Sequence, residues 1–165
     1  MTYFIMNFED RIAYDFLTST YQQATGETRS NGVETFVRYK PGNNLTLQAD
    51  YTYTNTEDPE GSLLPRRPRN KFGIHGQYHI GKFGFNTDLR WVGRREDGAF
   101  AKDLNGNPVT SLDPYTVVNL AATYQLTDKV QLYGRIDNLF NEYYEEAWSY
   151  ATPGRSAYVG VKMSF

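Results

Sequence analysis

Apolar and polar residues alternate along most of this 165-residue chain. In the segment 157–165, alternate positions hold Ala157, Val159, Val161, Met163 and Phe165, and polar or small residues and a tyrosine lie between them. Successive side chains of a β-strand point to opposite faces, so this segment is predicted to form a strand with one apolar face. The same pattern predicts about eight strands, at 3–14, 31–40, 45–54, 71–80, 83–91, 118–126, 130–137 and 157–165. In the first of them, one face is formed by Phe4, Met6, Phe8, Ile12 and Tyr14, and Asp10 interrupts the pattern.

The connections between these strands alternate strictly in length. Three are short and contain turn residues, at 41–44, 81–82 and 127–129. Four are long and polar, at 15–30, 55–69, 94–113 and 142–155. Outer-membrane barrels have short turns on the periplasmic side and long loops on the outer side. An even number of strands then places both ends of the strand set on the periplasmic side.

The pattern therefore predicts an all-β fold, a single domain over residues 1–165 that forms an antiparallel transmembrane β-barrel of about eight strands. Aromatic residues lie at strand ends, where membrane barrels carry their interfacial girdles; they are Tyr39, Tyr53, Trp91, Tyr124 and Phe165. A soluble antiparallel barrel or sandwich is the alternative, because its strands alternate as well. That alternative gives no reason for the difference in connection length.

Composition narrows the chemistry. The chain has no cysteine, which excludes disulfides, thiolate metal sites and cysteine nucleophiles, and its net charge of −2 gives no electrostatic case for nucleic acid as a partner. No apolar run approaches the roughly 20 residues of a membrane helix. No signal peptide precedes the first strand, so we expect a processed product, an engineered chain or a fragment. With no nucleophile elbow, zinc signature or phosphate loop, we expect neither an enzyme nor a cofactor.

Titratable residues are concentrated on the polar faces of the strands. The predicted interior charge network comprises Arg38, Lys71, Asp88, Arg90, Arg135, Asp137 and Lys162. His75 and His79 share a strand face but lie about 13 Å apart, too far for one metal ion, so no metal site is predicted. The basic run at Arg66, Arg67 and Arg69 is either a contact for an anionic headgroup or ligand, or a solvated strand end.

Several short segments carry a family resemblance. They are Asn138-Leu139-Phe140-Asn141-Glu142-Tyr143-Tyr144, then Pro153-Gly154-Arg155, the terminal strand ending in Phe165, and Gly32-Val33-Glu34 near the start. Their order and spacing resemble the carboxyl-terminal part of TonB-dependent outer-membrane receptors, especially the vitamin B12 and siderophore group. The strand at 3–14 also resembles the one that precedes the Gly-Val-Glu segment in that family, so the resemblance covers essentially the whole chain.

The resemblance implies a location in the bacterial outer membrane and a parent barrel of about 22 strands around a plug. This chain corresponds to about the last third of that barrel and has no plug. The implied function is uptake of a ferric siderophore or cobalamin, for which the chain alone is not expected to suffice. Its charged wall positions would face the plug. The implied partners are outer-membrane lipid, lipopolysaccharide, the ligand, and the barrel assembly machinery, for which Phe165 is the expected signal.

Three points stay open at this stage. The loop aromatics Phe100, Trp148 and Tyr150 are candidates for ligand contact, although packing is an alternative role for each. The chain could also be a stand-alone structural or adhesive barrel, or a soluble binding module. An open sheet would leave two unpaired edges in lipid, which favours closure for a chain that folds alone, with the interior charges paired to fill the lumen. Whether the eight strands close on themselves or pair with a second copy stays open.

Overall fold

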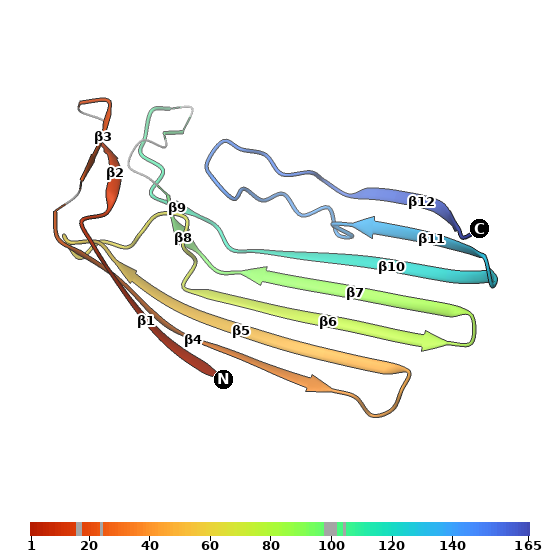
Figure 1. The fold of residues 1–165 in the computed structure, drawn as a ribbon. Coiled ribbons are helices and arrows are strands. Elements are labelled where there is room, and N and C mark those ends of the chain that lie inside the picture. Colours follow the sequence, from red (N-terminus) through yellow and green to blue (C-terminus); the bar gives the residue numbers. More distant parts are fainter. Residues whose placement is uncertain (16–17, 24, 98–101, 104) are drawn as a thin grey trace.

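A computed structural model describes residues 1–15, 18–23, 25–97, 102–103 and 105–165. Within these residues one antiparallel sheet of eight strands dominates the fold, and its strands are neighbours in chain order (Figure 1). The strands are β1 (Thr2–Glu9), β4 (Glu27–Tyr39), β5 (Leu45–Glu57), β6 (Asn70–Ile80), β7 (Phe83–Val92), β10 (Tyr115–Thr127), β11 (Val130–Asp137) and β12 (Ser156–Met163). The antiparallel all-β prediction is confirmed, as is the alternation of short and long connections. In the described residues no helix has the length and apolar character to cross a membrane.

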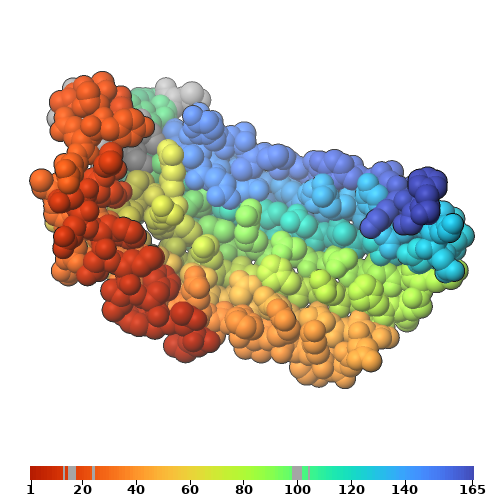
Figure 2. All heavy atoms as spheres, in the orientation of Figure 1, coloured from red at the N-terminus to blue at the C-terminus, as the bar shows by residue number. Residues whose placement is uncertain are grey.

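Two of the long connections contain small hairpins of their own. β2 (Ile12–Asp15) pairs with β3 (Thr20–Gln23), and the two-residue strands β8 (Arg95–Glu96) and β9 (Ser111–Leu112) pair with each other. The β2–β3 hairpin projects beyond the sheet at the end that carries the long connections (Figure 2). The predicted strand at 3–14 is therefore wrong beyond Glu9. Asp10 adopts a positive φ of 53°, which ends β1 and sends the chain into the hairpin.

The register places the apolar residues of seven strands on one face of the sheet. One row across it runs through Leu47, Gly76, Thr87, Leu120, Ile136 and Ala157, each paired with the next. Directly paired residues of an antiparallel sheet lie on the same face, so the apolar faces predicted for the separate strands coincide. We call this the apolar face, and the opposite one the polar face.

β1 differs from the sequence-based expectation. Tyr3 pairs with Val33, whereas Phe4 pairs with Gly32, so Tyr3 and Ile5 lie on the apolar face. The face predicted from Phe4, Met6 and Phe8 lies instead on the polar side. Both faces of β1 carry apolar residues, so alternation alone does not decide which of them belongs to the apolar face of the sheet. The pairing with β4 decides it.

The sheet is open: the eight strands do not close on themselves. β1 pairs with β4 only and β12 with β11 only, and these two strands form the opposite edges of the sheet (Figure 1). Closing eight strands requires a strongly coiled sheet, whereas this one curves gently, as the wall of a wider barrel does. The stand-alone barrel would need the closure that this sheet lacks.

The buried core is small and lies at the end with the long connections. Among the described residues the buried apolar side chains are Val92, Leu112, Tyr115 and Val117. Side chains along the strands stay exposed on the sheet faces; Val159, for example, is 89% exposed on the apolar face. The fold is thus a single layer with one packed cluster, and that cluster determines how the long connections are arranged.

Candidate functional site

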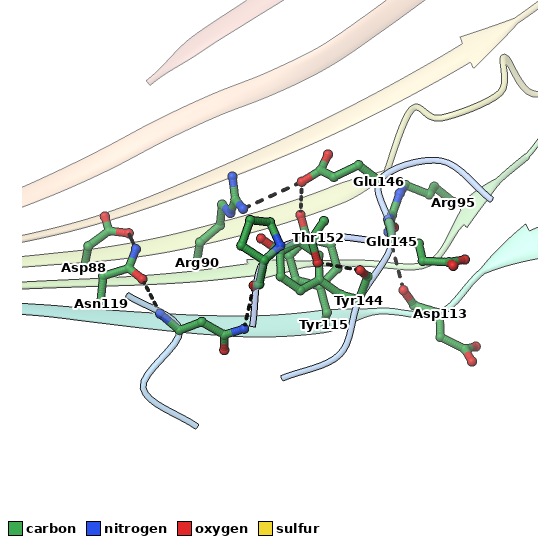
Figure 3. Close-up of polar contacts among 12 residues, drawn as sticks. Asp88, Arg90, Arg95, Asp113, Tyr115, Asn119, Tyr144, Glu145, Glu146 and Thr152 are labelled. Carbon is green, nitrogen blue, oxygen red and sulfur yellow. Dashed lines mark hydrogen bonds and ion pairs between the residues drawn. The ribbon is translucent and has the colours of Figure 1, made fainter. Parts of the chain in front are cut away.

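Tyr115 is the centre of the packed cluster. It is the first residue of β10, lies on the polar face opposite Val92 of β7, and is 3% exposed. Its ring stacks on Tyr144 at a centroid distance of 4.1 Å and an interplanar angle of 24°. The guanidinium groups of Arg95 and Arg90 lie 5.2 Å and 5.7 Å from the Tyr115 ring centroid, so the ring is enclosed by one aromatic residue and two cations (Figure 3).

The hydroxyl of Tyr115 connects the sheet to the long connection between β11 and β12. It donates a hydrogen bond of 2.5 Å to Oε1 of Glu146, and the same oxygen lies 3.6 Å from Nη2 of Arg90 (Figure 3). Arg95 is 3% exposed, and its guanidinium donates to the carbonyl oxygens of Asp113 and Glu145. These contacts bind the segment 144–146 against the ends of β7 and β10.

Asp97 joins three long connections at one buried carboxylate. Its side chain has no exposed surface; Oδ1 accepts a 2.9 Å hydrogen bond from Nε of Arg66, and Oδ2 accepts a 2.6 Å bond from the backbone N–H of Trp148. Arg66 belongs to the β5–β6 connection and Trp148 to the β11–β12 connection. Of the basic run at 66–69, Arg66 therefore has a structural role that neither sequence interpretation anticipated.

The Asn-Leu-Phe-Asn segment forms a tight turn directly after β11. Asn138 has a positive φ of 52° and is almost fully buried; its Oδ1 accepts from the Glu142 N–H at 2.8 Å. Its Nδ2 donates to the carbonyl oxygens of Glu142 at 2.9 Å and Pro153 at 3.3 Å. Oδ1 of Asn141 accepts from the Arg155 N–H at 2.9 Å. The two asparagines thus hold both ends of the β11–β12 connection together and bring Tyr144 onto Tyr115.

A cavity of about 190 Å³ opens beside this cluster. It is lined by residues 111–115 and 143–145 and by Trp148, a set that combines four aromatic side chains with the carboxylates of Asp113 and Glu145. The Trp148 indole Nε1–H donates to the Lys102 carbonyl at 2.9 Å, which holds the ring in place. The hydroxyl of Tyr143 donates to Glu145 at 3.2 Å, and this hydrogen bond raises the pKa of Tyr143 above its ordinary value. Aromatic and acidic groups together suit a ligand group that is flat, hydroxylated or cationic.

The three loop aromatics predicted from the sequence have different positions. Trp148 lines the cavity and Tyr150 is 73% exposed outside it, while Phe100 lies outside the described residues. Sequence reasoning missed Tyr115, Tyr143 and Tyr144. The two adjacent tyrosines close the quoted family segment, so their position after Asn141 was an available signal. Tyr115 offered none, because its burial depends on loops far away in sequence.

The predicted interior charges all lie on the polar face, and several of them form local contacts. Arg38 donates to Gln48 through Nε and Nη2 at 3.0 and 2.7 Å, and Arg135 lies 3.1 Å from Asp137 and 4.6 Å above the Tyr158 ring. Arg90 is the one that reaches the Tyr115 cluster. We find no ion pair for Lys71 or Lys162 within the described residues.

His75 connects charged groups from three strands. Nδ1 lies 2.7 Å from Oδ2 of Asp88 on β7, and Nε2 lies 3.0 Å from Oδ1 of Asp50 on β5. Asp50 reaches His75 across Gly73, where a Cβ would lie 2.8 Å from the carboxylate oxygens. His79 has a separate place, with its ring over Gly84. The described residues hold no group of three or more histidine or acidic side chains with metal-binding geometry.

An open, one-layer antiparallel sheet with an apolar face, a charged face and long connections packed at one end is the wall of an outer-membrane β-barrel. The family model for the TonB dependent receptor-like beta-barrel matches residues 1–139, and the chain belongs to that family. Its members are bacterial outer-membrane proteins, so the soluble alternative is wrong.

Curated relatives agree with the family assignment. The vitamin B12 transporter BtuB of Vibrio cholerae serotype O1 is 28% identical over 156 residues, which are 93% of this chain and 25% of that protein. The vitamin B12 transporter BtuB of Vibrio vulnificus is 32% identical over 111 residues, 64% of this chain and 17% of that protein. The chain therefore spans about a quarter or less of the length of these relatives.

Solved structures agree in fold. The ferripyoverdine receptor of the Pseudomonas aeruginosa outer membrane, bound to ferripyoverdine, matches with a TM-score of 0.82 at 20% identity, over 99% of this chain and 24% of that one. The copper transporter OprC matches with a TM-score of 0.79 at 23% identity, over 99% of this chain and 27% of that one. The relatives found are transporters and receptors.

Proposed function

We propose that this chain forms part of the barrel wall of an uptake receptor for a ferric siderophore or cobalamin, and that its long connections supply part of the ligand-binding surface. The cavity of about 190 Å³ beside Tyr115 carries this proposal, because aromatic and carboxylate groups line it at the outer rim of the polar face. The names of the relatives support the substrate class, since they include vitamin B12 transporters and a ferripyoverdine receptor. The proposal assigns the chain no catalytic step.

The cavity suits a contact subsite. Sites for small molecules typically enclose about 300–1,000 Å³, so a cavity of about 190 Å³ would take one ring or side group of a larger ligand. The buried contacts of Tyr115 and Asp97 would keep the lining side chains in place before the ligand arrives, which lowers the entropy cost of binding. Trp148 is the proposed principal contact; Tyr150 and Phe100 are proposed as outer contacts.

Transport needs more than this wall. We propose that Arg38, Lys71 and the other charges of the polar face contact a plug inside the complete barrel, and that the chain alone does not transport. Side chains such as Asp88 and Arg135 are about half exposed here, which leaves them available for such contacts. Purified wall alone, reconstituted in vesicles, is expected to give no ligand uptake above empty vesicles; uptake at the rate of the full-length receptor would overturn this part.

Ligand binding by the full-length receptor tests the main proposal. Cyanocobalamin and a panel of ferric siderophores are titrated by calorimetry, and one of them is expected to bind the wild type. Trp148→Ala should weaken that binding about 10- to 100-fold, because it removes a large aromatic contact. Tyr39→Ala, at the short-turn end, removes an exposed aromatic residue of the other rim and serves as the matched control.

The outcomes are distinct. If no siderophore and no cobalamin binds the wild type, the uptake proposal fails. If a ligand binds but Trp148→Ala and Tyr39→Ala affect its affinity equally, the receptor assignment stands and the cavity is not the subsite.

We also propose that Phe165 is read by the barrel assembly machinery. Its side chain lies after the end of β12 and is fully exposed. In cells, Phe165→Ala should slow the appearance of heat-modifiable receptor several-fold, whereas Met163→Ala, which removes an exposed apolar side chain from the last residue of β12, should not. Equal assembly rates for the two variants would refute a special role for Phe165.

A further inference from the structure

The short-turn end of the sheet carries a regular set of lysines. The three short connections of the main sheet are 40–44, 81–82 and 128–129, and each contains one lysine: Lys40, Lys82 or Lys129. All three are exposed, and Asp128 is the acidic residue in these connections. In an outer-membrane barrel this rim meets the periplasmic leaflet, where lysines attract anionic headgroups.

Hydrogen bonds join the neighbouring turns that carry Lys82 and Lys129. The carbonyl of Lys82 accepts from the Gln125 N–H at 2.9 Å, and the Lys82 ammonium donates to the Leu126 carbonyl at 3.3 Å. Lys82 therefore reaches toward the β10–β11 turn, which contains Lys129. The Lys129 carbonyl in turn accepts from the Ser164 N–H at 2.9 Å, which ties that turn to the end of β12.

A long apolar groove lies on the apolar face above these turns. Its volume is about 600 Å³. It crosses β5 to β12, and its lining includes Leu45, Gly76, Phe85, Ala122, Gly134 and Val159. Because this face contacts lipid in an outer-membrane barrel, an acyl chain is the natural occupant of an apolar groove within it.

The distance between lysines and groove fits one phospholipid leaflet. Gly134 follows Lys129 by five residues, roughly 17 Å along a strand at about 3.3 Å per residue. Strands tilted by about 40° reduce this to roughly 13 Å along the membrane normal. Half of a hydrocarbon core about 30 Å thick is about 15 Å. A headgroup at the lysines thus places the end of its acyl chain in the groove.

Aromatic side chains lie where the short turns and the groove meet. Phe83 packs against Tyr124 at a centroid distance of 4.7 Å and stacks with Phe85 at 6.2 Å. All three lie on the apolar face: Phe83 and Tyr124 are next to the turns, and Phe85 lines the groove. Aromatic residues at this depth mark the boundary between headgroups and acyl chains.

We propose that this part of the wall is a binding site for an anionic glycerophospholipid of the periplasmic leaflet, with its phosphate at Lys82 and Lys129 and one acyl chain in the groove. Lys40 extends the basic rim toward β4. The site depends on the location of the barrel in the outer membrane and not on which ligand the long connections bind. The lysines recognise the headgroup and the groove recognises the acyl chain, so substitutions can abolish one contact and keep the other.

Native mass spectrometry of the full-length protein in detergent tests this. Phosphatidylglycerol and phosphatidylethanolamine with identical chains are titrated, and phosphatidylglycerol is expected to bind at least about tenfold tighter. The double variant K82Q/K129Q should lose that preference. The control K102Q removes one lysine charge from a long connection at the other end and should keep the preference.

A second pair of variants tests the groove. Gly134→Leu and Ala122→Leu each add volume to its floor. A Cβ at Gly134 would approach no atom closer than 3.8 Å, so the backbone there accepts a side chain. Both should weaken the two lipids several-fold and leave the headgroup preference intact. A heat-dependent shift in gel mobility identifies the variants that fold. The two substitutions fill the groove at different strands, so each tests it independently.

Several results would overturn the proposal. If the wild type binds both lipids with equal affinity, the lysines do not recognise the headgroup. The same follows if K102Q loses the preference for phosphatidylglycerol as fully as K82Q/K129Q does. Unchanged affinity in both filled variants removes the acyl-chain part. A dimer that either filled variant dissociates, with no change in lipid affinity, would assign the groove to a second copy of the protein.

Discussion

The backbone N–H of Trp148 donates a 2.6 Å hydrogen bond to the buried carboxylate of Asp97, 51 positions earlier in the chain. Arg66 donates to the other oxygen of the same carboxylate at 2.9 Å. One side chain therefore contacts two other long connections from a third. The position of Trp148 beside the cavity depends on this contact.

Replacing Asp97 should loosen the loop that holds Trp148. Asp97→Ala removes two hydrogen bonds to an ionised group, and such bonds contribute about 1.5–3 kcal/mol each. A loss of about 2 kcal/mol in local stability corresponds to roughly 30-fold faster amide exchange at Trp148. Hydrogen exchange measured by mass spectrometry on the peptide around 148 checks this.

Asp113→Ala is the control for Asp97→Ala in this exchange measurement. Asp113 also pairs with an arginine, Arg94 at 3.2 Å, but its side chain is 88% exposed, so the pair contributes little. Unchanged exchange at Trp148 in Asp97→Ala would mean that the loop is held by other contacts.

The Tyr115 hydroxyl should stabilise the β11–β12 connection independently of the stacking of its ring. Tyr115→Phe keeps the stacking on Tyr144 and removes the bond to Glu146, which should destabilise the β11–β12 connection by about 1–2 kcal/mol. Cleavage of that connection by a protease should accelerate by roughly 5- to 30-fold. Tyr150→Phe, at a 73% exposed tyrosine of the same connection, should leave cleavage unchanged. Equal cleavage in both variants would contradict this role of the hydroxyl.

Asn138 combines two roles that substitutions can separate. Asn138→Gly keeps the positive φ accessible and removes the side-chain hydrogen bonds, whereas Asn138→Ala also adds a backbone cost of about 1 kcal/mol. Protection of the Glu142 amide should therefore decrease in both variants and decrease further in the alanine variant. If the glycine variant matched the wild type, the side-chain contacts would contribute nothing.

Asp103 should titrate below the ordinary range of aspartate. Hydrogen bonds from the Asn107 side chain and backbone, and from the Asn105 N–H, lower the pKa of Asp103. A carboxyl group whose pKa is lower in the folded state contributes stability above its unfolded pKa of about 3.9, and this is lost as the pH falls through the folded value.

Carbon-13 NMR of the Asp103 carboxyl, followed from pH 6 to pH 2, should give a midpoint below about 3.9. Asn107→Ala should move the midpoint back toward that reference. A midpoint at or above the reference in the wild type would show that the turn does not form in solution.

The sequence by itself determined most of the strands, the apolar faces of seven of them and the alternation of short and long connections. These features are local: a period of two and the turn residues at 81–82 act within a few positions. The family segment from Asn138 to Tyr144 was also readable without a structure. In β1, apolar residues lie on both faces of the strand, so the alternation does not show which face continues the apolar face of the sheet. Only the pairing with β4 decides this.

Tertiary structure decided the open sheet and the cluster at the outer rim. Whether eight strands close depends on the coiling of the whole sheet, which no single strand encodes. Tyr115, Asp97 and Trp148 come together from connections up to 51 residues apart, and their burial follows from packing among those connections. Alternation describes one strand at a time, and it therefore could not locate a site that several long connections build jointly.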